Sequence, residues 1–372
     1  MKILVTGSAG FIGHFLTRHL LKKGHEVIGI DNINDYYDVN LKYDRLKRCG
    51  IESNTIFWNK EICSDKFPLY RFIKLNLEDK TELMALSKKE KFDIIVNLAA
   101  QAGVRNSISN PDVYVQSNVV GFLNILEICR SNDVKHLVYA SSSSVYGLNE
   151  QKPYSVSQNA NHPISLYAAT KKSNELMAHV YSHLFKLPTT GLRFFTVYGP
   201  WGRPDMGYFL FTEAIMNKQP IKLFNQGKMM RDFTYIDDII DGISHVLENP
   251  PQPAKGWNAL NPNPSFSSAP YRIYNIGNDN PVNLIDFIRE IEKNCGIKAK
   301  IELMDMQPGD VPVTWADVDD LLKNFNYKPD TSIQKGIQEF TKWYKKYYSG
   351  KKQLPSTLNV INQIEKEPLP AY

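Results

Sequence analysis

Residues 2–13 read KILVTGSAGFIG, a short apolar run followed by glycines at three-residue spacing. The apolar run predicts a buried strand, and the following FIGHFLTRHLLKKG predicts a helix. Gly7, Gly10 and Gly13 then lie where the backbone could approach a phosphate at the N-terminus of that helix. Tight turns from a strand to a helix also use glycine for steric reasons alone, so the triplet needs support from the rest of the chain.

The alternation that begins with this stretch continues to about residue 140. Apolar runs are separated by amphipathic segments, and these runs read KILVT, EVIGID, FIKL, FDIIVNLAA and HLVYAS. This order predicts an α/β protein with a Rossmann-type doubly wound parallel sheet.

A carboxylate and several small residues indicate which dinucleotide such a sheet would bind. Asp31 ends the second predicted strand, about twenty residues beyond the glycines, where it can accept hydrogen bonds from an adenosine ribose. A carboxylate there would repel a 2′-phosphate, which favours NAD over NADP, although an aspartate can also simply cap a strand. Ala99, Ala100 and Gly103 follow a later strand, either beside a dinucleotide or in tight packing.

The sequence divides into three parts. Residues 1–200 are assigned to an NAD-binding Rossmann domain, with an insertion at about 32–70 that is rich in tyrosine and charge. Residues 201–348 are assigned mainly to a smaller α/β C-terminal substrate-binding region, with some segments returning to the Rossmann sheet. Residues 349–372 contain prolines and no strong period, and we expect a loosely attached tail.

Composition excludes several classes of protein. The net charge of +5 is spread along the chain without a basic stripe, so no nucleic-acid partner is expected. The four cysteines have no metal-ligand spacing, which favours reduced thiols and no bound metal. The chain shows no signal segment and no membrane-spanning run, and we therefore expect a cytoplasmic protein with no membrane partner.

Residues 167–171 read YAATK, which places a tyrosine and a lysine four residues apart. If the segment is helical, Tyr167 and Lys171 share a face. A nearby ammonium group favours phenolate over phenol, which would lower the pKa of Tyr167 toward the range of a general base. The same spacing also occurs by chance on surface helices.

Together with Gly7, Gly10, Gly13 and Asp31, this pair resembles the YxxxK signature of the short-chain dehydrogenase/reductase superfamily. The resemblance is to its extended branch, the NAD-dependent epimerase/dehydratase family, and covers residues 1 to about 345. It implies NAD as the cofactor, Tyr167 and Lys171 as catalytic residues, and Ser142 as the hydroxyl beside the tyrosine. The cofactor-binding residues that it implies are Gly7, Gly10, Phe11, Ile12, Gly13, Asp31, Asn32, Asn76, Leu77, Ala99, Ala100, Gln101, Asn118, Tyr167 and Lys171.

Four serines occupy residues 141–144, directly before Val-Tyr-Gly. Relatives that dehydrate nucleotide sugars carry Asp-Glu in the two positions before this tripeptide, and decarboxylating relatives carry Glu in the second. Here these positions are Ser143 and Ser144, and a hydroxyl cannot replace a carboxylate as an acid or base near neutral pH. The absence of a second acid favours epimerisation. Ser141 has no predicted role beyond ending the strand.

Several separated segments resemble the members of this family that act on UDP-glucuronate. They are NDYYD (34–38), RFFTVYGPWGRPDM (193–206), SSAPYRIYNIGN (267–278) and PGDVPVTWADVDDL (308–321). The resemblance implies reversible C4 epimerisation of UDP-glucuronate to UDP-galacturonate through a 4-keto intermediate, with tightly bound NAD. The substrate-binding residues that it implies are Arg105, Ser142, Ser143, Thr196, Arg203, Arg231 and Asp310. Gln307 and Asn76 depart from the family pattern, where an arginine and an aspartate are usual.

Other functions stay open at this point. The nearest is a 4-epimerase for UDP-glucose or UDP-N-acetylglucosamine, which Thr196 disfavours because such relatives carry asparagine there. Arg203 could be an ordinary surface arginine, and Arg231 could form a solvated salt bridge with Asp232 or Asp237. A non-catalytic NAD-binding regulatory protein and a net dehydrogenase are further alternatives. The family resemblance also implies a homodimer.

Overall fold

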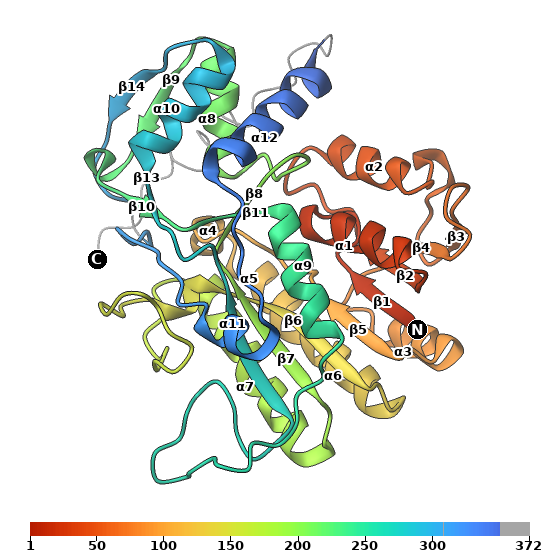
Figure 1. The fold of residues 1–372 in the computed structure, drawn as a ribbon. Coiled ribbons are helices and arrows are strands. Elements are labelled where there is room, and N and C mark those ends of the chain that lie inside the picture. The colour runs from red at the N-terminus through yellow and green to blue at the C-terminus, as the bar shows by residue number, and fades with distance from the viewer. Residues whose placement is uncertain (308, 350–372) are drawn as a thin grey trace.

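The computed structural model describes residues 1–307 and 309–349 and confirms the predicted α/β architecture. Its centre is an eight-stranded sheet of order β12-β7-β6-β5-β1-β2-β4-β3 (Figure 1). In chain order the strands are β1 (Lys2–Thr6), β2 (Glu26–Asp31), β3 (Glu61–Cys63), β4 (Tyr70–Lys74), β5 (Ile94–Asn97), β6 (His136–Ser142), β7 (Thr189–Phe194) and β12 (Tyr271–Ile276). Neighbouring strands are parallel, and only the edge pair of β3 and β4 is antiparallel.

Helices cover both faces of this sheet. Successive side chains of a strand point to opposite faces, so Ile3 and Val5 of β1 pack into one hydrophobic cluster and Leu4 into another. The helices on the first face are α1 (Phe11–Lys22) and α9 (Ile236–Leu247), and those on the second are α3 (Lys80–Glu90), α6 (Gly121–Ser131) and α7 (Leu166–Phe185). The carboxyl ends of the parallel strands are thereby left as the edge where a ligand can bind.

The insertion after β2 is ordered around one helix, α2 (Val39–Arg48). The helix begins where the Asp38 carboxylate accepts a hydrogen bond from the Asn40 amide at 3.0 Å, an N-cap of the usual kind. A short 3₁₀ turn (Ser53–Thr55) and strand β3 complete the segment. The apolar side of α2 joins the same cluster as α1, so the insertion packs beside the glycine loop.

A smaller lobe lies beyond the carboxyl ends of the strands (Figure 1). Its elements are β8 (Thr196–Tyr198), α8 (Gly207–Met216), β9 (Pro220–Leu223), a 3₁₀ turn (Asn225–Gly227), β10 (Met230–Arg231), β11 (Phe233–Tyr235), β13 (Val282–Asn283), α10 (Leu284–Cys295), β14 (Lys300–Leu303) and α12 (Ile333–Tyr348). Three two-stranded sheets pair β8 with β11, β9 with β14, and β10 with β13. Between these pieces the chain returns to the large sheet through α9, β12 and α11 (Asp319–Phe325).

Short irregular helices occupy the two connections nearest the cavity. After β5 come α4 (Asn106–Ser109), α5 (Pro111–Tyr114) and a π-helical turn (Val115–Val120), which runs directly into α6. After β6 comes a 3₁₀ turn (Ser143–Tyr146). Single π-helical turns such as Val115–Val120 occur frequently at functional sites.

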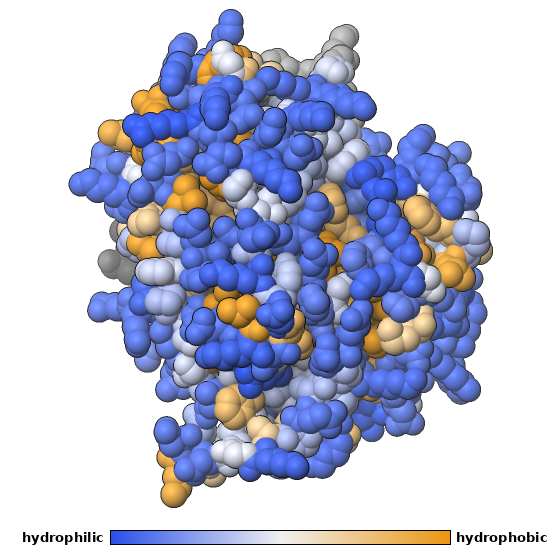
Figure 2. All heavy atoms as spheres, in the orientation of Figure 1, coloured by the Kyte–Doolittle hydropathy of each residue, from blue (hydrophilic) through white to orange (hydrophobic). Residues whose placement is uncertain are grey.

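The surface and the terminal segment complete the description. Hydrophilic side chains cover most of the face shown in Figure 2, and apolar residues gather there only in small separate patches. Within the described residues, no helix has the length and apolar character that crossing a bilayer requires. The predicted tail falls almost entirely on residues 350–372, which lie outside the described part of the chain.

Candidate active site

A single large cavity collects the predicted site residues. Its volume is about 1490 Å³, above the roughly 300–1,000 Å³ of an ordinary small-molecule pocket, so it has room for a dinucleotide and a second ligand. It extends from the glycine loop across the ends of β5 and β6 to the small lobe. All the predicted cofactor, catalytic and substrate residues line it except Asn76 and Asn118.

The glycine loop is shaped by close backbone contacts. Gly7 has a φ of +70°, and a Cβ atom added there would lie 2.9 Å from the Ala99 amide nitrogen. A Cβ at Gly13 would lie 2.1 Å from the Gly7 carbonyl oxygen. The first turn of α1 has neither an acidic residue nor a side-chain cap, so its amide groups are open to an anion. The loop therefore fits a pyrophosphate group.

Asp31 both supports this loop and lines the cavity. Its carboxylate accepts hydrogen bonds from the amide of Ala9 at 3.2 Å and from that of Ile33 at 2.8 Å. The capping role considered from the sequence is thus present. A carboxylate offers about four acceptor sites, so Asp31 retains capacity for a ribose diol.

Two predicted cofactor residues, Asn76 and Asn118, lie outside the cavity wall. Asn118, in the π-helical turn, accepts a hydrogen bond from the Gln101 amide and donates to the Gln101 carbonyl oxygen and to Thr170. It therefore fixes the loop after β5 against α7, from behind the wall. Asn76 is half-buried between the cavity-lining residues Leu75 and Leu77 but does not itself line the cavity.

Tyr167 and Lys171 lie in the first two turns of α7, as the sequence predicted. The Lys171 amine is 6.0 Å from the centre of the Tyr167 ring and donates a hydrogen bond to the Ala140 carbonyl oxygen at 3.0 Å. Burial raises the pKa of Tyr167, against smaller lowering effects from the Arg203 charge and the Ser142 hydroxyl. Burial lowers the pKa of Lys171 to about 8. The pKa of Tyr167 is thus raised, not lowered as expected from the sequence, because burial is the largest effect on it.

Ser142 is the last residue of β6 and begins the 3₁₀ turn. Its Oγ accepts hydrogen bonds from the Ser144 amide at 3.2 Å and from the Ser144 hydroxyl at 2.9 Å. The serines at 142, 143 and 144 all line the cavity. The run of serines is therefore a structured turn beside Tyr167, with each residue in a different position.

Ser141 anchors this strand end from behind, a role that the sequence did not reveal. Its hydroxyl donates to Glu175 Oε1 at 2.7 Å, and the same carboxylate is bound by Arg193 through two hydrogen bonds of 2.8 and 2.9 Å. Both charged groups are buried within the fold, at 1% and 0% exposure. Burial opposes ionisation, but the charges of Arg193 and Lys172 hold the pKa of Glu175 at about 2.

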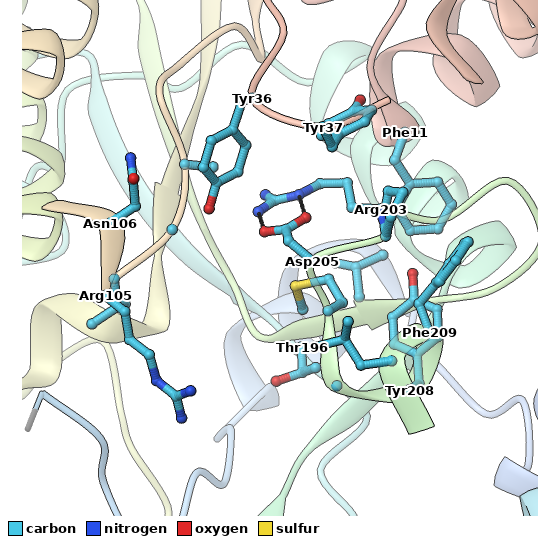
Figure 3. Close-up of a pocket in the computed structure, with 18 of the residues that line it drawn as sticks. Phe11, Tyr36, Tyr37, Arg105, Asn106, Thr196, Arg203, Asp205, Tyr208 and Phe209 are labelled. Carbon is cyan, nitrogen blue, oxygen red and sulfur yellow. Dashed lines mark hydrogen bonds and ion pairs between the residues drawn. The ribbon is translucent and has the colours of Figure 1, made fainter. Parts of the chain in front are cut away.

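The substrate side of the cavity is built from charges that already have partners. Arg203 makes a two-point ion pair with Asp205, through Nε at 3.0 Å and through Nη2. Figure 3 shows this pair between the tyrosines at 36 and 37 and the side chain of Thr196. Arg203 is therefore a cavity residue and not the ordinary surface arginine considered above. Asp205 and Tyr36 belong to the segments quoted for the resemblance, but no role was predicted for them.

A second pair joins two other predicted substrate residues. Arg105 Nη2 lies 3.0 Å from Asp310 Oδ2. Arg231 instead donates to the carbonyl oxygens of Met230 and Pro312, and Asp232 is bound by backbone amides. Within residues 1–307 and 309–349, no salt bridge is formed by Arg231, so the alternative of a solvated pair does not describe it. Its guanidinium group lines the cavity beside Asp310.

Arg45, which the sequence did not single out, connects the glycine loop to the substrate side of the cavity. It is fully buried within the insertion. Its guanidinium group donates to the carbonyl oxygens of Ala9, Trp201 and Gly202 and to the Tyr37 hydroxyl. The glycine loop and the turn before Arg203 are thus held by one side chain. No local sequence motif reveals the role of Arg45, because its partners are mostly backbone carbonyl groups.

The similarity of the chain to known proteins agrees with the geometry of this site. The model described as the NAD dependent epimerase/dehydratase family matches residues 3–277. The chain belongs to this family. Protein CapI of Staphylococcus aureus is 56% identical over 348 residues, which are 94% of this chain and 99% of the relative. UDP-glucuronate 4-epimerase 4 of Arabidopsis thaliana is 44% identical over 356 residues, which are 94% of this chain and 77% of the relative.

A solved structure extends the comparison. UDP-glucuronic acid 4-epimerase from Bacillus cereus, in complex with UDP-glucuronic acid and NAD, is 31% identical. The TM-score is 0.80, and the match covers 94% of this chain and 100% of that chain. The chain is an NAD-dependent nucleotide-sugar 4-epimerase, as predicted. Its glycine loop, the open N-terminus of α1 and Asp31 fit the pyrophosphate and ribose of NAD.

Proposed function

We propose that the chain interconverts UDP-glucuronate and UDP-galacturonate at C4, through a 4-keto intermediate and with tightly bound NAD. The observation that carries the proposal is the placement of Thr196 and Arg203, a hydroxyl group and a cation, in the cavity that holds Tyr167. The Arg203 charge acts on the tyrosine phenol, as the direction of its pKa effect indicates. Relatives named for UDP-glucuronate, at 42% and 44% identity, support the same substrate.

The proposed chemistry uses three side chains. Tyr167 accepts the proton of the 4-hydroxyl group as a general base. Ser142 donates a hydrogen bond to the same oxygen, and Lys171 provides positive charge beside the tyrosine. Bound NAD would supply hydride acceptance and return at C4. Once the keto sugar has turned within the cavity, the same residues serve the return step, and Tyr167 gives its proton back.

The substrate side of the cavity would bind the carboxylate of the sugar. Oxidation at C4 produces a β-keto acid, which loses carbon dioxide when its carboxylate bond aligns with the carbonyl π system. Thr196 and Arg203 would hold the carboxylate out of that alignment by charge-assisted hydrogen bonds. In the described structure Asp205 occupies the Nε and Nη2 donors of Arg203, so Nη1 is the donor with which a second carboxylate can bond first.

The same ion pair favours a second candidate function. Since Asp205 neutralises Arg203, the cavity wall carries little net charge at this point and could accept a neutral hexose. The alternative is a 4-epimerase for UDP-glucose or UDP-N-acetylglucosamine, with the same catalytic residues.

The test is incubation of the purified protein with UDP-glucuronate, followed by NMR of the products. We expect UDP-galacturonate to accumulate without added NAD, and without a pentose product. Parallel incubation with UDP-glucose and UDP-N-acetylglucosamine identifies the alternative. Turnover of only a neutral sugar would overturn the assignment of UDP-glucuronate, and a pentose product would overturn the protective role of Thr196 and Arg203.

We also propose a homodimer that pairs through α6 and α7. The outer sides of these helices expose large apolar residues, among them Leu123, Leu176, Val180 and Leu184. Leu176, Val180 and Leu184 recur every four residues and so share one side of α7, and an exposed apolar helix side of this kind often marks a protein interface. Light scattering should give twice the mass of the chain, and a Leu176→Glu substitution should give the mass of one chain.

A further inference from the structure

The hydroxyl group of Ser142 has both of its acceptor positions occupied. A serine oxygen carries one proton and two lone pairs. The Ser144 amide donates to Ser142 Oγ at 3.2 Å, and the Ser144 hydroxyl donates to the same oxygen at 2.9 Å. Both donors come from one residue in the 3₁₀ turn, whose first hydrogen bond is the capping bond to Ser142. The remaining function of the Ser142 hydroxyl is to donate its proton.

We propose that Ser144 is a positioning residue that fixes Ser142 as a hydrogen-bond donor toward the reacting oxygen. The inference rests on the roles proposed above for Ser142 and Tyr167. Ser142, Ser144 and Tyr167 all line the same cavity, so the free proton has the sugar oxygen and the tyrosine oxygen as its acceptors.

The reaction needs a donor at this place in both of its halves. While the sugar is an alcohol, its oxygen gives its proton to Tyr167 and can accept a bond from Ser142. When the sugar is a ketone, its oxygen can only accept hydrogen bonds, and a fixed donor stabilises the negative charge that develops as hydride returns. A serine that rotated to accept would oppose both halves. Ser144 removes that freedom, because it occupies the acceptor positions in advance.

One observation and one comparison of side-chain chemistry agree with this role. The Ser142 hydroxyl is among the effects that lower the pKa of Tyr167, the direction expected for a donor to the phenolate. In addition, a carboxylate at position 144, as in the decarboxylating relatives, would accept a bond from Ser142 and direct its proton away from the sugar. The hydroxyl group of Ser144 therefore orients Ser142, in addition to leaving position 144 without an acid.

The experiment compares Ser144→Ala, Ser144→Thr and Ser142→Ala in the full-length protein with bound NAD. Epimerisation of UDP-glucuronate is followed by NMR, and a neutral UDP-sugar replaces it if the wild type turns over only that sugar. We expect Ser144→Ala to lower kcat about tenfold with little change in KM, and Ser144→Thr to restore most of the rate. Ser142→Ala should lower kcat about 100-fold. In Ser144→Ala the acidic limb of the pH profile should move to higher pH, because Tyr167 has lost part of its donor.

The double variant Ser142→Ala/Ser144→Ala gives the decisive readout. If Ser144 acts through Ser142, its removal has no further effect once Ser142 is alanine. Equal additional loss in the double variant would overturn the proposal and would place Ser144 directly on the substrate. Wild-type rates in Ser144→Ala with a slow Ser142→Ala would also overturn it. Full activity of Ser142→Ala would instead refute the catalytic assignment on which the inference rests.

Discussion

The two sides of the cavity are built by different means. On the cofactor side, the binding surface consists mainly of backbone groups, namely a left-handed glycine, an open helix N-terminus and carbonyl groups. On the substrate side, long charged side chains form the surface, and they are paired as Arg203 with Asp205 and Arg105 with Asp310. The first kind of site offers one fixed shape, whereas the second can exchange its partners. A family can therefore change its sugar while it keeps its cofactor.

The largest effect is expected at Tyr167, where the two sides meet. Tyr167→Phe removes the general base but keeps the ring, so kcat should fall about 100- to 10,000-fold while NAD stays bound. Product NMR and the absorbance of bound nucleotide measure the two properties. Loss of NAD together with activity would show that the tyrosine belongs to the cofactor side.

Next in size is a change to the backbone of the cofactor side. Gly13→Ala would place a methyl group 2.1 Å from the Gly7 carbonyl oxygen. We expect loss of copurified NAD and a decrease of about 1–3 kcal/mol in the free energy of unfolding. Gly256→Ala is the matched control, because a Cβ there meets no atom within 4 Å. Normal NAD retention in Gly13→Ala would contradict the role of the backbone on this side.

A smaller and more selective effect is expected from the charges of the substrate side. Arg203→Gln removes a charged donor worth roughly 1.5–3 kcal/mol, so KM for UDP-glucuronate should rise about 10- to 100-fold. NAD retention should not change, and the pentose formed by loss of carbon dioxide should increase. Asp205→Asn tests the pairing separately, and we expect it to lower KM for UDP-glucuronate because a competing carboxylate is gone. Equal effects of Arg203→Gln on UDP-glucose and UDP-glucuronate would show that Arg203 does not recognise the carboxylate.

The smallest effect concerns pH. Burial lowers the pKa of Lys171 to about 8, so the ammonium is charged below that pH and neutral above it. If the charge assists Tyr167, kcat/KM should decline as pH rises through about 8. Lys171→Arg keeps the charge at all these values, so its smaller activity should lack this decline. A profile that is flat from about pH 7 to about pH 10 in the wild type would contradict the role.

The same contrast explains what could be predicted from the sequence. The glycines, Asp31 and the helical pair at 167 and 171 are local motifs, and the structure places them in one cavity. The partner of Arg105 lies 205 residues away, and no local pattern reveals it. Two residues that the sequence did single out also differ from expectation. Burial raises the pKa of Tyr167. Asn118 lies behind the cavity wall, where it bonds to Gln101. Burial and pairing depend on the whole fold.

The buried Arg45 has a consequence for how related sequences can vary. Three of its four acceptors are backbone carbonyl groups, at Ala9, Trp201 and Gly202. A carbonyl group is supplied by any residue, so these hydrogen bonds do not select the side chain at the three positions. Gly202 is restricted for another reason, because a Cβ atom there would lie 1.8 Å from the Tyr208 hydroxyl oxygen. Lysine cannot replace the arginine, since it lacks the planar fork that reaches several acceptors at once. Among homologues, we therefore expect a constant arginine at this position, with Tyr37, its side-chain acceptor, as the residue that can vary alongside it.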